Sequence, residues 1–394
     1  MRTVLAVAVA AVALTAGAAI AIPRHASAPA APTSQLITST VDQLAATQEH
    51  LRSVPGDWTA WARLGLVYVE RARTTADPAW YAKADGALAT SDRLNPANVD
   101  ALIGKGALAN ARHDFTLARD LARQAIKANP YSSEAWGVLA DALTQLGSAA
   151  EATDAVQHML DLRPGVPAYA RAAYDLEQHG RIAEARGLWE RALTDAHSPA
   201  DVAYLQVQLG DLAWHTGDAT AARDHYRRAL SADPGSLPAR AGLARATGDL
   251  ALWGQVTQTF PSPSLLIEYA VQLRSFGRAT EAAQQLDLAD AALALFAESG
   301  GRDDLGLAEL AIARGSYADA VAAARREFSR RQHSDVTAVL AWALYLSGDA
   351  RSALDYARQS VALGYRNSVN LTHLRVISAA LGADRLARLE RYAA

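Results

Sequence analysis

Apolar residues recur along this chain at helical spacing, and the pattern repeats with a fixed period. Pro96, Pro130 and Pro164 each follow the previous one by 34 residues. Between successive prolines lie two amphipathic stretches separated by a short turn. Because proline has no N–H for the helical hydrogen-bond ladder, each proline predicts the end of a helix. A fixed period of this length is typical of a solenoid built from helix pairs.

The unit at 131–164 shows how large and small residues interlock. The large residues fall at positions 4, 7, 11 and 24 counted from Ser133: Trp136, Leu139, Leu143 and Val156. Such residues lie one or two helical turns apart and share a face. Small residues at positions 8 and 20, Ala140 and Ala152, let two helix backbones approach closely. The unit is therefore predicted to form a pair of antiparallel helices.

The same register holds in most other units. A glycine stands in the predicted turn before the second helix: Gly147, Gly180, Gly217, Gly277, Gly315, Gly348 and Gly382. Five residues further on stands an alanine: Ala152, Ala185, Ala222, Ala282, Ala320, Ala353 and Ala387. One helix pair cannot bury its own apolar face, so neighbouring pairs are expected to stack.

The first unit carries a recognisable motif. Counted from Trp58, it places Trp61, Leu64, Gly65 and Tyr68 as W-x-x-L-G-x-x-Y. With the register above, this resembles the tetratricopeptide (TPR) repeat family. The resemblance implies an all-α fold, a TPR-type α-solenoid. This would be a right-handed superhelix of antiparallel helix pairs, with about nine repeats plus capping helices.

The register also predicts how the chain is divided. We expect a signal peptide or N-terminal membrane anchor at 1–28, a flexible linker at 29–36 and an N-terminal capping helix at 37–56. A regular TPR array at 57–262 is followed by a degenerate array with a C-terminal cap at 263–394. Repeats are expected to begin near residues 58, 99, 133, 166, 203, 237, 263, 301 and 334. In the unit that begins at 263, the second helix is expected to continue to Glu298.

The amino terminus predicts export. Met1-Arg2 precedes an apolar run from Val4 to Ile22, and Ala26-Ser27-Ala28 fits a cleavage site. The apolar run is also long enough to remain as an uncleaved membrane anchor. Either outcome places the repeats outside the cytoplasm, secreted or in the cell envelope. In architecture and signal, the chain is similar to secreted TPR proteins of high-GC actinobacteria.

Composition and motifs argue against several function classes. A net charge of −3 does not favour nucleic-acid binding, which needs clustered cations. The chain has no cysteine, and therefore no disulfide or thiolate site. No phosphate loop, nucleophile elbow or zinc-helix motif occurs. We expect a non-enzymatic protein without cofactors, although a hydrolase with its site in the groove stays open as an alternative.

The TPR resemblance implies which residues face a ligand. Positions 2, 5, 9, 12 and 13 of each first helix line the concave groove in this family. They carry Asp141, Gln145, Tyr174, Glu177, Tyr204, Asp211, Trp214, His215, Arg245, Arg274, Trp342 and Tyr345, and also Thr144 and Gln178. Aromatics beside carboxylates and amides suit a protein or peptide partner, here one that is secreted or membrane-bound. The alternative is that some of these side chains pack against adjacent helices.

The charges in this groove restrict which kinds of partner can bind. Asp141, Glu177 and Asp211 make its middle acidic, which favours a basic or neutral partner. They also occupy the places where carboxylate-clamp TPR proteins present lysine and asparagine. Trp342 is expected to face the groove, whereas Trp61, Trp136 and Trp189 fall on core positions.

Two other patterns allow a second function. Asp211 and His215 lie four residues apart on one helical face, with His225 nearby, and could form part of a metal site. This supports an alternative, a metal-handling or transport accessory protein of the cell envelope. The other interpretation is a local pair in which the helix dipole favours a protonated histidine. The basic run Arg325-Arg326 to Arg330-Arg331 is expected to be a solvated helix face that ends in a basic turn, or alternatively a lipid or nucleic-acid patch.

Overall fold

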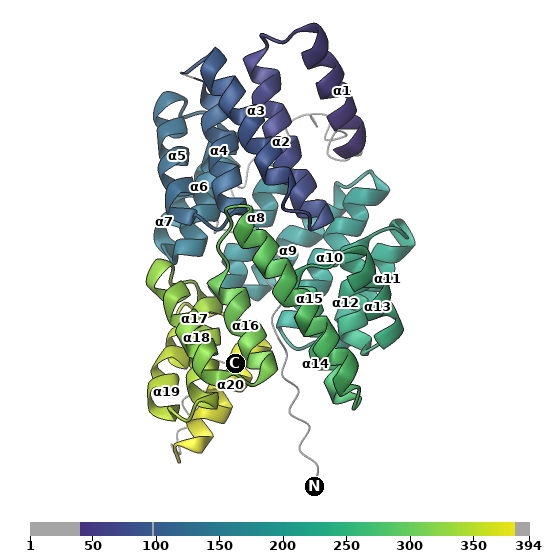
Figure 1. The fold of residues 1–394 in the computed structure, drawn as a ribbon, viewed down its shortest axis with the longest axis vertical. Coiled ribbons are helices and arrows are strands. Elements are labelled where there is room, and N and C mark those ends of the chain that lie inside the picture. The colour runs from purple at the N-terminus through teal and green to yellow at the C-terminus, as the bar shows by residue number, and fades with distance from the viewer. Residues whose placement is uncertain (1–39, 97, 383–394) are drawn as a thin grey trace. The chain divides into compact units, whose positions relative to one another are not determined.

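The structure is a computed structural model that describes residues 40–96 and 98–382 of the 394-residue chain. Every regular element in these residues is a helix, and there are 20 of them (Figure 1). This confirms the predicted all-α class. The predicted signal or anchor, the linker and the charged C-terminal cap after Gly382 lie outside the described residues. None of the described helices combines the length and apolar character that a membrane span requires.

The helices follow one another as successive pairs between α1 and α20. Their bounds are α1 Thr40–Ser53, α2 Trp58–Thr75, α3 Trp80–Leu94, α4 Val99–Ala111, α5 Phe115–Ala128, α6 Ser133–Leu146, α7 Ala149–Leu162, α8 Val166–Gln178, α9 Ile182–Thr194, α10 Pro199–His215, α11 Ala219–Ala232, α12 Leu237–Thr247, α13 Leu250–Thr259, α14 Pro263–Ser275, α15 Ala279–Glu298, α16 Asp304–Arg314, α17 Tyr317–Arg330, α18 Ser334–Leu346, α19 Ala350–Gln359 and α20 Ser368–Ala380. In the described residues, α2 to α19 make nine pairs, as the register predicts.

The predicted turn glycines end the first helices. All seven have a positive φ, between 61° and 96°, a conformation that glycine adopts at little cost. At Gly147, for example, the backbone N–H donates to the carbonyls of Leu143 and Thr144. The paired alanines from Ala152 to Ala353 are all buried, and Ala387 lies outside the described residues. The glycine and alanine register is confirmed wherever the structure describes it.

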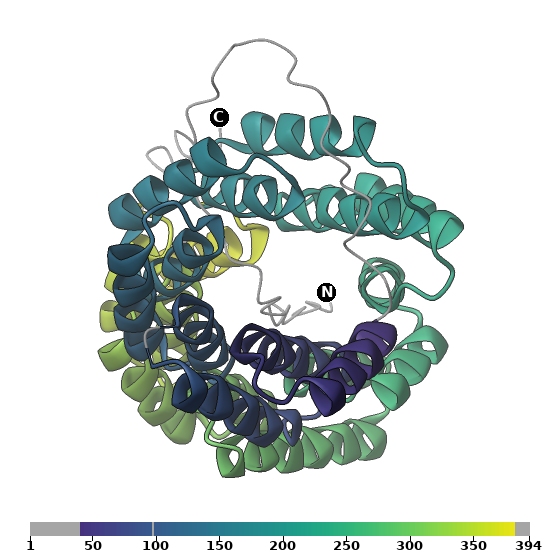
Figure 2. The ribbon, with the colours of Figure 1, turned by 90° about the horizontal axis from the view of Figure 1, so that it is seen from above.

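The described residues form two compact units, and each is described here by itself. The N-terminal unit comprises residues 40–175 and 295–302, and the C-terminal unit comprises 176–294 and 303–382. Within each unit, a first helix contacts both its own second helix and the next first helix. Examples are α4 with α5 and α6, and α16 with α17 and α18. These contacts build two layers of helices (Figure 2). The boundary at residue 262 between regular and degenerate repeats stays a prediction.

In the N-terminal unit, the segment 295–302 packs against the first two repeats. The ring of Phe296 lies edge-on to Tyr81, with centroids 6.2 Å apart. The backbone N–H of Arg302 donates to the carbonyl of Arg112 at 3.0 Å. This segment contains the last turn of the long helix that was predicted to end at Glu298, and α15 does end there.

In the C-terminal unit, the last repeats contact the first turn of the unit. Gly364, in the loop after α19, lies so close to Gly180 that a Cβ built on Gly180 would be 2.3 Å from its carbonyl oxygen. The hydroxyl of Ser334, at the start of α18, donates to Gln178 at 2.7 Å. Residues more than 150 positions apart therefore hold this unit together.

Candidate functional site

Charged side chains connect the first helices of neighbouring repeats. In the N-terminal unit, Arg171 of α8 donates two hydrogen bonds of 2.6 Å to the carboxylate of Asp141 on α6. Asp141 stands at position 9 of its repeat, and Arg171 at position 6 of the next one. A bidentate pair of this kind fixes both the distance and the orientation of the two groups.

The same link occurs in the C-terminal unit with the charges exchanged. Arg245 of α12, at position 9, donates to Glu268 of α14, at position 6, over 2.6 and 2.8 Å. Their side chains are only 12% and 9% exposed. Burial alone would lower the pKa of Arg245, but the adjacent Glu268 carboxylate raises it above its usual value. Arg245 is therefore charged at any physiological pH.

The charged residue at position 9 of the repeat that begins at 203 has a different kind of partner. The hydroxyl of Tyr226 on α11 donates to Asp211 of α10 at 2.7 Å. Position 6 of the following repeat is Gly242, and a Cβ there would lie 2.3 Å from the Tyr226 ring. A Cβ on Gly210 would also lie too close to this ring, at 2.6 Å. Burial and the Asp211 charge raise the pKa of Tyr226 well above its usual value, so its phenol remains a donor.

A buried carboxylate and a histidine form the next contact. Nδ1 of His215, the last residue of α10, donates to Glu177 of α8 at 2.8 Å. Burial lowers the pKa of His215, but the Glu177 charge and hydrogen bond outweigh it and raise the pKa to about 9. His215 is therefore protonated at neutral pH.

The register of these helix pairs agrees with a comparison of the sequence with family profiles. Residues 109–176 and 171–236 each match a profile described as tetratricopeptide repeat. These residues are TPR repeats. A comparison with curated proteins gave no match.

Several solved TPR-like structures resemble the chain at low sequence identity. Yeast Tom70 is 15% identical, with 88% of this chain and 87% of that chain covered and a TM-score of 0.40. The human IFIT1 dimer with m7Gppp-AAAA is 16% identical, with 81% and 76% covered and a TM-score of 0.49. YrrB, described as a TPR protein with an unusual peptide-binding site, is 15% identical, with 49% and 95% covered and a TM-score of 0.31. At this identity the likeness concerns the fold alone.

The aromatic residues predicted for the TPR groove differ in accessibility. Tyr174, Tyr204, Trp214 and Tyr345 are half-buried on their first helices. Trp342 is only 4% exposed, and its prediction as a groove residue is wrong. Its indole lies flat on the imidazole of His373 from α20, with centroids 3.9 Å apart, because the next helix covers this part of α18.

The remaining predicted residues are tied to their surroundings. Gln145 is buried, and so is Glu177, whose carboxylate is bound to His215. Arg274 is exposed but donates to the carbonyl of Ala313 at the end of α16. Of the three tryptophans predicted for the core, Trp189 is buried, whereas Trp61 and Trp136 are half-buried.

The residues of the metal interpretation bind different partners. Asp211 accepts from Tyr226, His215 donates to Glu177, and His225 contacts Gln206 at 2.8 Å. Across the described residues, no three histidine, aspartate or glutamate side chains come together in a way that could hold a metal ion. Asp211 and His215 therefore lack a third ligand there.

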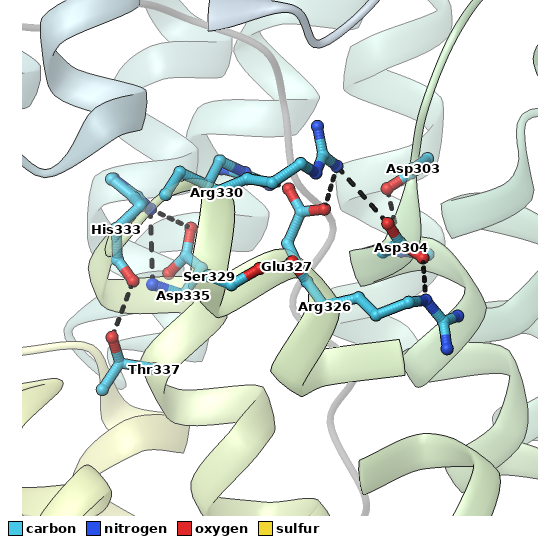
Figure 3. A network of polar contacts seen from close by, with 11 residues as sticks. Asp303, Asp304, Arg326, Glu327, Ser329, Arg330, His333, Asp335 and Thr337 are labelled. Carbon is cyan, nitrogen blue, oxygen red and sulfur yellow. Dashed lines mark hydrogen bonds and ion pairs between the residues drawn. The ribbon is translucent and has the colours of Figure 1, made fainter. Parts of the chain in front are cut away.

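Only the first two arginines of the basic run, Arg325 and Arg326, lie on an exposed helix face. Figure 3 shows that Arg326 reaches Asp304 and that Arg330 reaches both Asp304 and Glu327. Arg331 pairs with Glu327 as well and is only 3% exposed. The prediction was wrong for Arg330 and Arg331, because the acidic side chains lie one helical turn away and on the preceding helix.

The sequence prediction missed one site residue that the register could have identified. Glu309 on α16 stands at position 9 of the repeat that begins at 301 and is buried. Counting the degenerate repeats as strictly as the regular ones would have placed it with Asp141 and Asp211.

Proposed function

We propose that this protein is an exported, non-enzymatic TPR scaffold that binds a protein or peptide partner along the first helices of its repeats. The observation that carries the proposal is the series of charged pairs between these helices, such as Arg245 with Glu268. Such pairs hold the helices in a fixed spacing before any partner arrives, and a rigid surface loses less entropy on binding. Half-buried aromatics, Trp214 and Tyr345, lie on first helices of the same layer and can anchor a partner.

The partner we propose is secreted or membrane-bound, because the amino terminus has the pattern of an export signal. This combination is the type found in secreted TPR proteins of high-GC actinobacteria, and we include that similarity in the proposal. Fractionation of cells that express the full chain with a C-terminal tag tests it. We expect the tag in the medium or the envelope, with a new amino terminus near Ala28 if the signal is cleaved. A full-length chain confined to the cytoplasm would contradict export.

Capture from a cell-envelope extract tests binding. The immobilised parent protein should retain a specific protein, and Trp214→Ala or Tyr345→Ala should reduce the retained amount at least tenfold. Tyr131→Ala is the matched control, since Tyr131 is an aromatic residue that is 81% exposed in the turn before α6. If retention of the partner falls only in the control variant, or in none of the three variants, the first-helix surface is not the binding surface.

A further inference from the structure

Position 9 of the first helix is charged in four repeats. Three of these charged residues have a hydrogen-bond partner within the chain. Asp141 is bound by Arg171, Arg245 by Glu268 and Asp211 by Tyr226. In the first two cases, the partner comes from position 6 of the next repeat. The fourth charged residue at this position is Glu309 on α16.

Glu309 has no such partner. Position 6 of the next repeat is Val339 on α18, which has no polar atom in its side chain. Glu309 is only 6% exposed. Within residues 40–96 and 98–382, its pKa is shifted mainly by burial and by through-space charges, with no side-chain hydrogen bond among these influences. In the described residues, the Glu309 carboxyl oxygens are not among the fully buried polar atoms that lack a partner, so they keep some contact with solvent. A donor that comes from outside the chain can therefore supply the hydrogen bonds that this mostly buried carboxyl group lacks.

The surroundings of Glu309 are acidic. Burial raises its pKa well above the usual value, and the charges of Asp303, Asp335 and Glu268 raise it further, whereas Arg331 opposes them. Three arginines of this region already donate to carboxylates. Arg331 binds Glu327. Figure 3 shows that Arg330 also binds Glu327 and that Arg326 binds Asp304. A cation brought from outside would therefore meet a net negative environment.

We propose that Glu309 receives an arginine side chain of the bound partner, in the place that position 6 of the next repeat fills elsewhere. This inference rests on the proposed scaffold function and specifies the chemistry of its partner. A guanidinium matches the site because its planar fork binds a carboxylate through two hydrogen bonds, as Arg171 does with Asp141. In the complex, the carboxylate of Glu309 pairs with the guanidinium.

Fluorescence anisotropy with the purified full chain tests this proposal. The probe is a labelled octapeptide of alanine, serine and tyrosine with one central arginine. The comparison peptide has citrulline, the neutral isostere, in place of that arginine. We expect the arginine peptide to bind at least tenfold more tightly, which corresponds to about 1.4 kcal/mol. Because burial and the neighbouring carboxylates raise the pKa of Glu309, pairing with a guanidinium should lower it, and calorimetry in two buffers of different ionisation enthalpy should detect proton release on binding.

Three variants identify the residue responsible. Glu309→Gln has the shape of a protonated glutamic acid and should bind both peptides equally, without proton release and with an unchanged melting temperature. Val339→Arg places an arginine at position 6 of the same chain, so it should raise the melting temperature and abolish the preference for arginine. Glu184→Gln is the control, because this glutamate is exposed on α9 and should leave the preference intact.

Two results would overturn the assignment. One is the absence of a preference for the arginine peptide in the parent protein. The other is a preference that survives both Glu309→Gln and Val339→Arg. If the envelope partner is still captured by the parent in either case, this site is wrong while the scaffold function stands.

Discussion

Arg171 holds the carboxylate of Asp141 with two hydrogen bonds of 2.6 Å, and three repeats later in the chain the same two positions carry the opposite charges. There, Arg245 occupies the place of Asp141, and Glu268 occupies that of Arg171. The position of the link is kept while its polarity is reversed. What the two first helices require is thus a complementary pair at this spacing, whichever helix supplies the cation.

Breaking the buried pair of Arg245 and Glu268 should lower the free energy of unfolding, whereas exchanging the two residues should be tolerated. Glu268→Gln leaves the Arg245 guanidinium buried without a counter-charge, which should lower the free energy of unfolding by about 3–5 kcal/mol. The double variant Arg245→Glu with Glu268→Arg restores a complementary pair in the polarity of Asp141 and Arg171. It should recover at least half of that loss in urea denaturation. A double variant less stable than Glu268→Gln would show that the pair depends on more than complementary charge.

The contact between the loop after α19 and the α8–α9 turn should depend on Gly364. This residue has a φ of 101°, and a Cβ on it would lie 2.8 Å from the carbonyl oxygen of His179. Gly348 has a similar φ of 96° but open space around it, so it is the matched control. Gly348→Ala should cost about 1–2 kcal/mol through the left-handed backbone alone. Gly364→Ala should cost at least about 1 kcal/mol more, and equal melting temperatures would show that the close approach does not matter.

The fold followed from the sequence because its determinants are local and repeated. A turn glycine and an alanine five residues later define where each helix pair bends and where its helices meet. Gly147 and Ala152 occupy those roles in the structure as the spacing indicates. Even the long α15 was predicted, since no proline stands before Gly300-Gly301 to end it earlier.

The site was less predictable, because its partners come from other repeats. Asp211 and His215 are neighbours on one helix, and the sequence suggested that they act together. Their partners, Tyr226 and Glu177, are 15 and 38 residues away and come from other helices. The burial of Trp342 could not be predicted for the same reason, since it depends on His373 from the next repeat. Position in a repeat indicates the layer that a side chain faces, but its contacts depend on what the neighbouring repeat places there.

Close packing between paired helices should make the small alanines sensitive to size. Ala152 on α7 is buried, whereas Ala150 on the same helix is exposed. Ala152→Leu should lower the free energy of unfolding by roughly 1–3 kcal/mol, because the added atoms force neighbouring side chains apart. Ala150→Leu should change it by less than about 0.5 kcal/mol. Urea denaturation of the two variants compares them directly, and similar midpoints would contradict the packing at Ala152.

The bond between His215 and Glu177 should make stability depend on pH on the alkaline side. The folded pKa of His215, about 9, lies above the unfolded value near 6.5, so protonation favours the folded state. This contribution is complete below about pH 6.5 and is lost as the pH rises to about 9. Its upper limit is about 3 kcal/mol, reduced by solvent because the His215 side chain is 29% exposed. Urea denaturation at intervals from pH 6 to 9.5 should show a declining free energy of unfolding for the parent and for the control Glu184→Gln. Glu177→Gln, which removes the negative charge, should flatten that decline, and an equal slope in all three proteins would mean that His215 does not carry it.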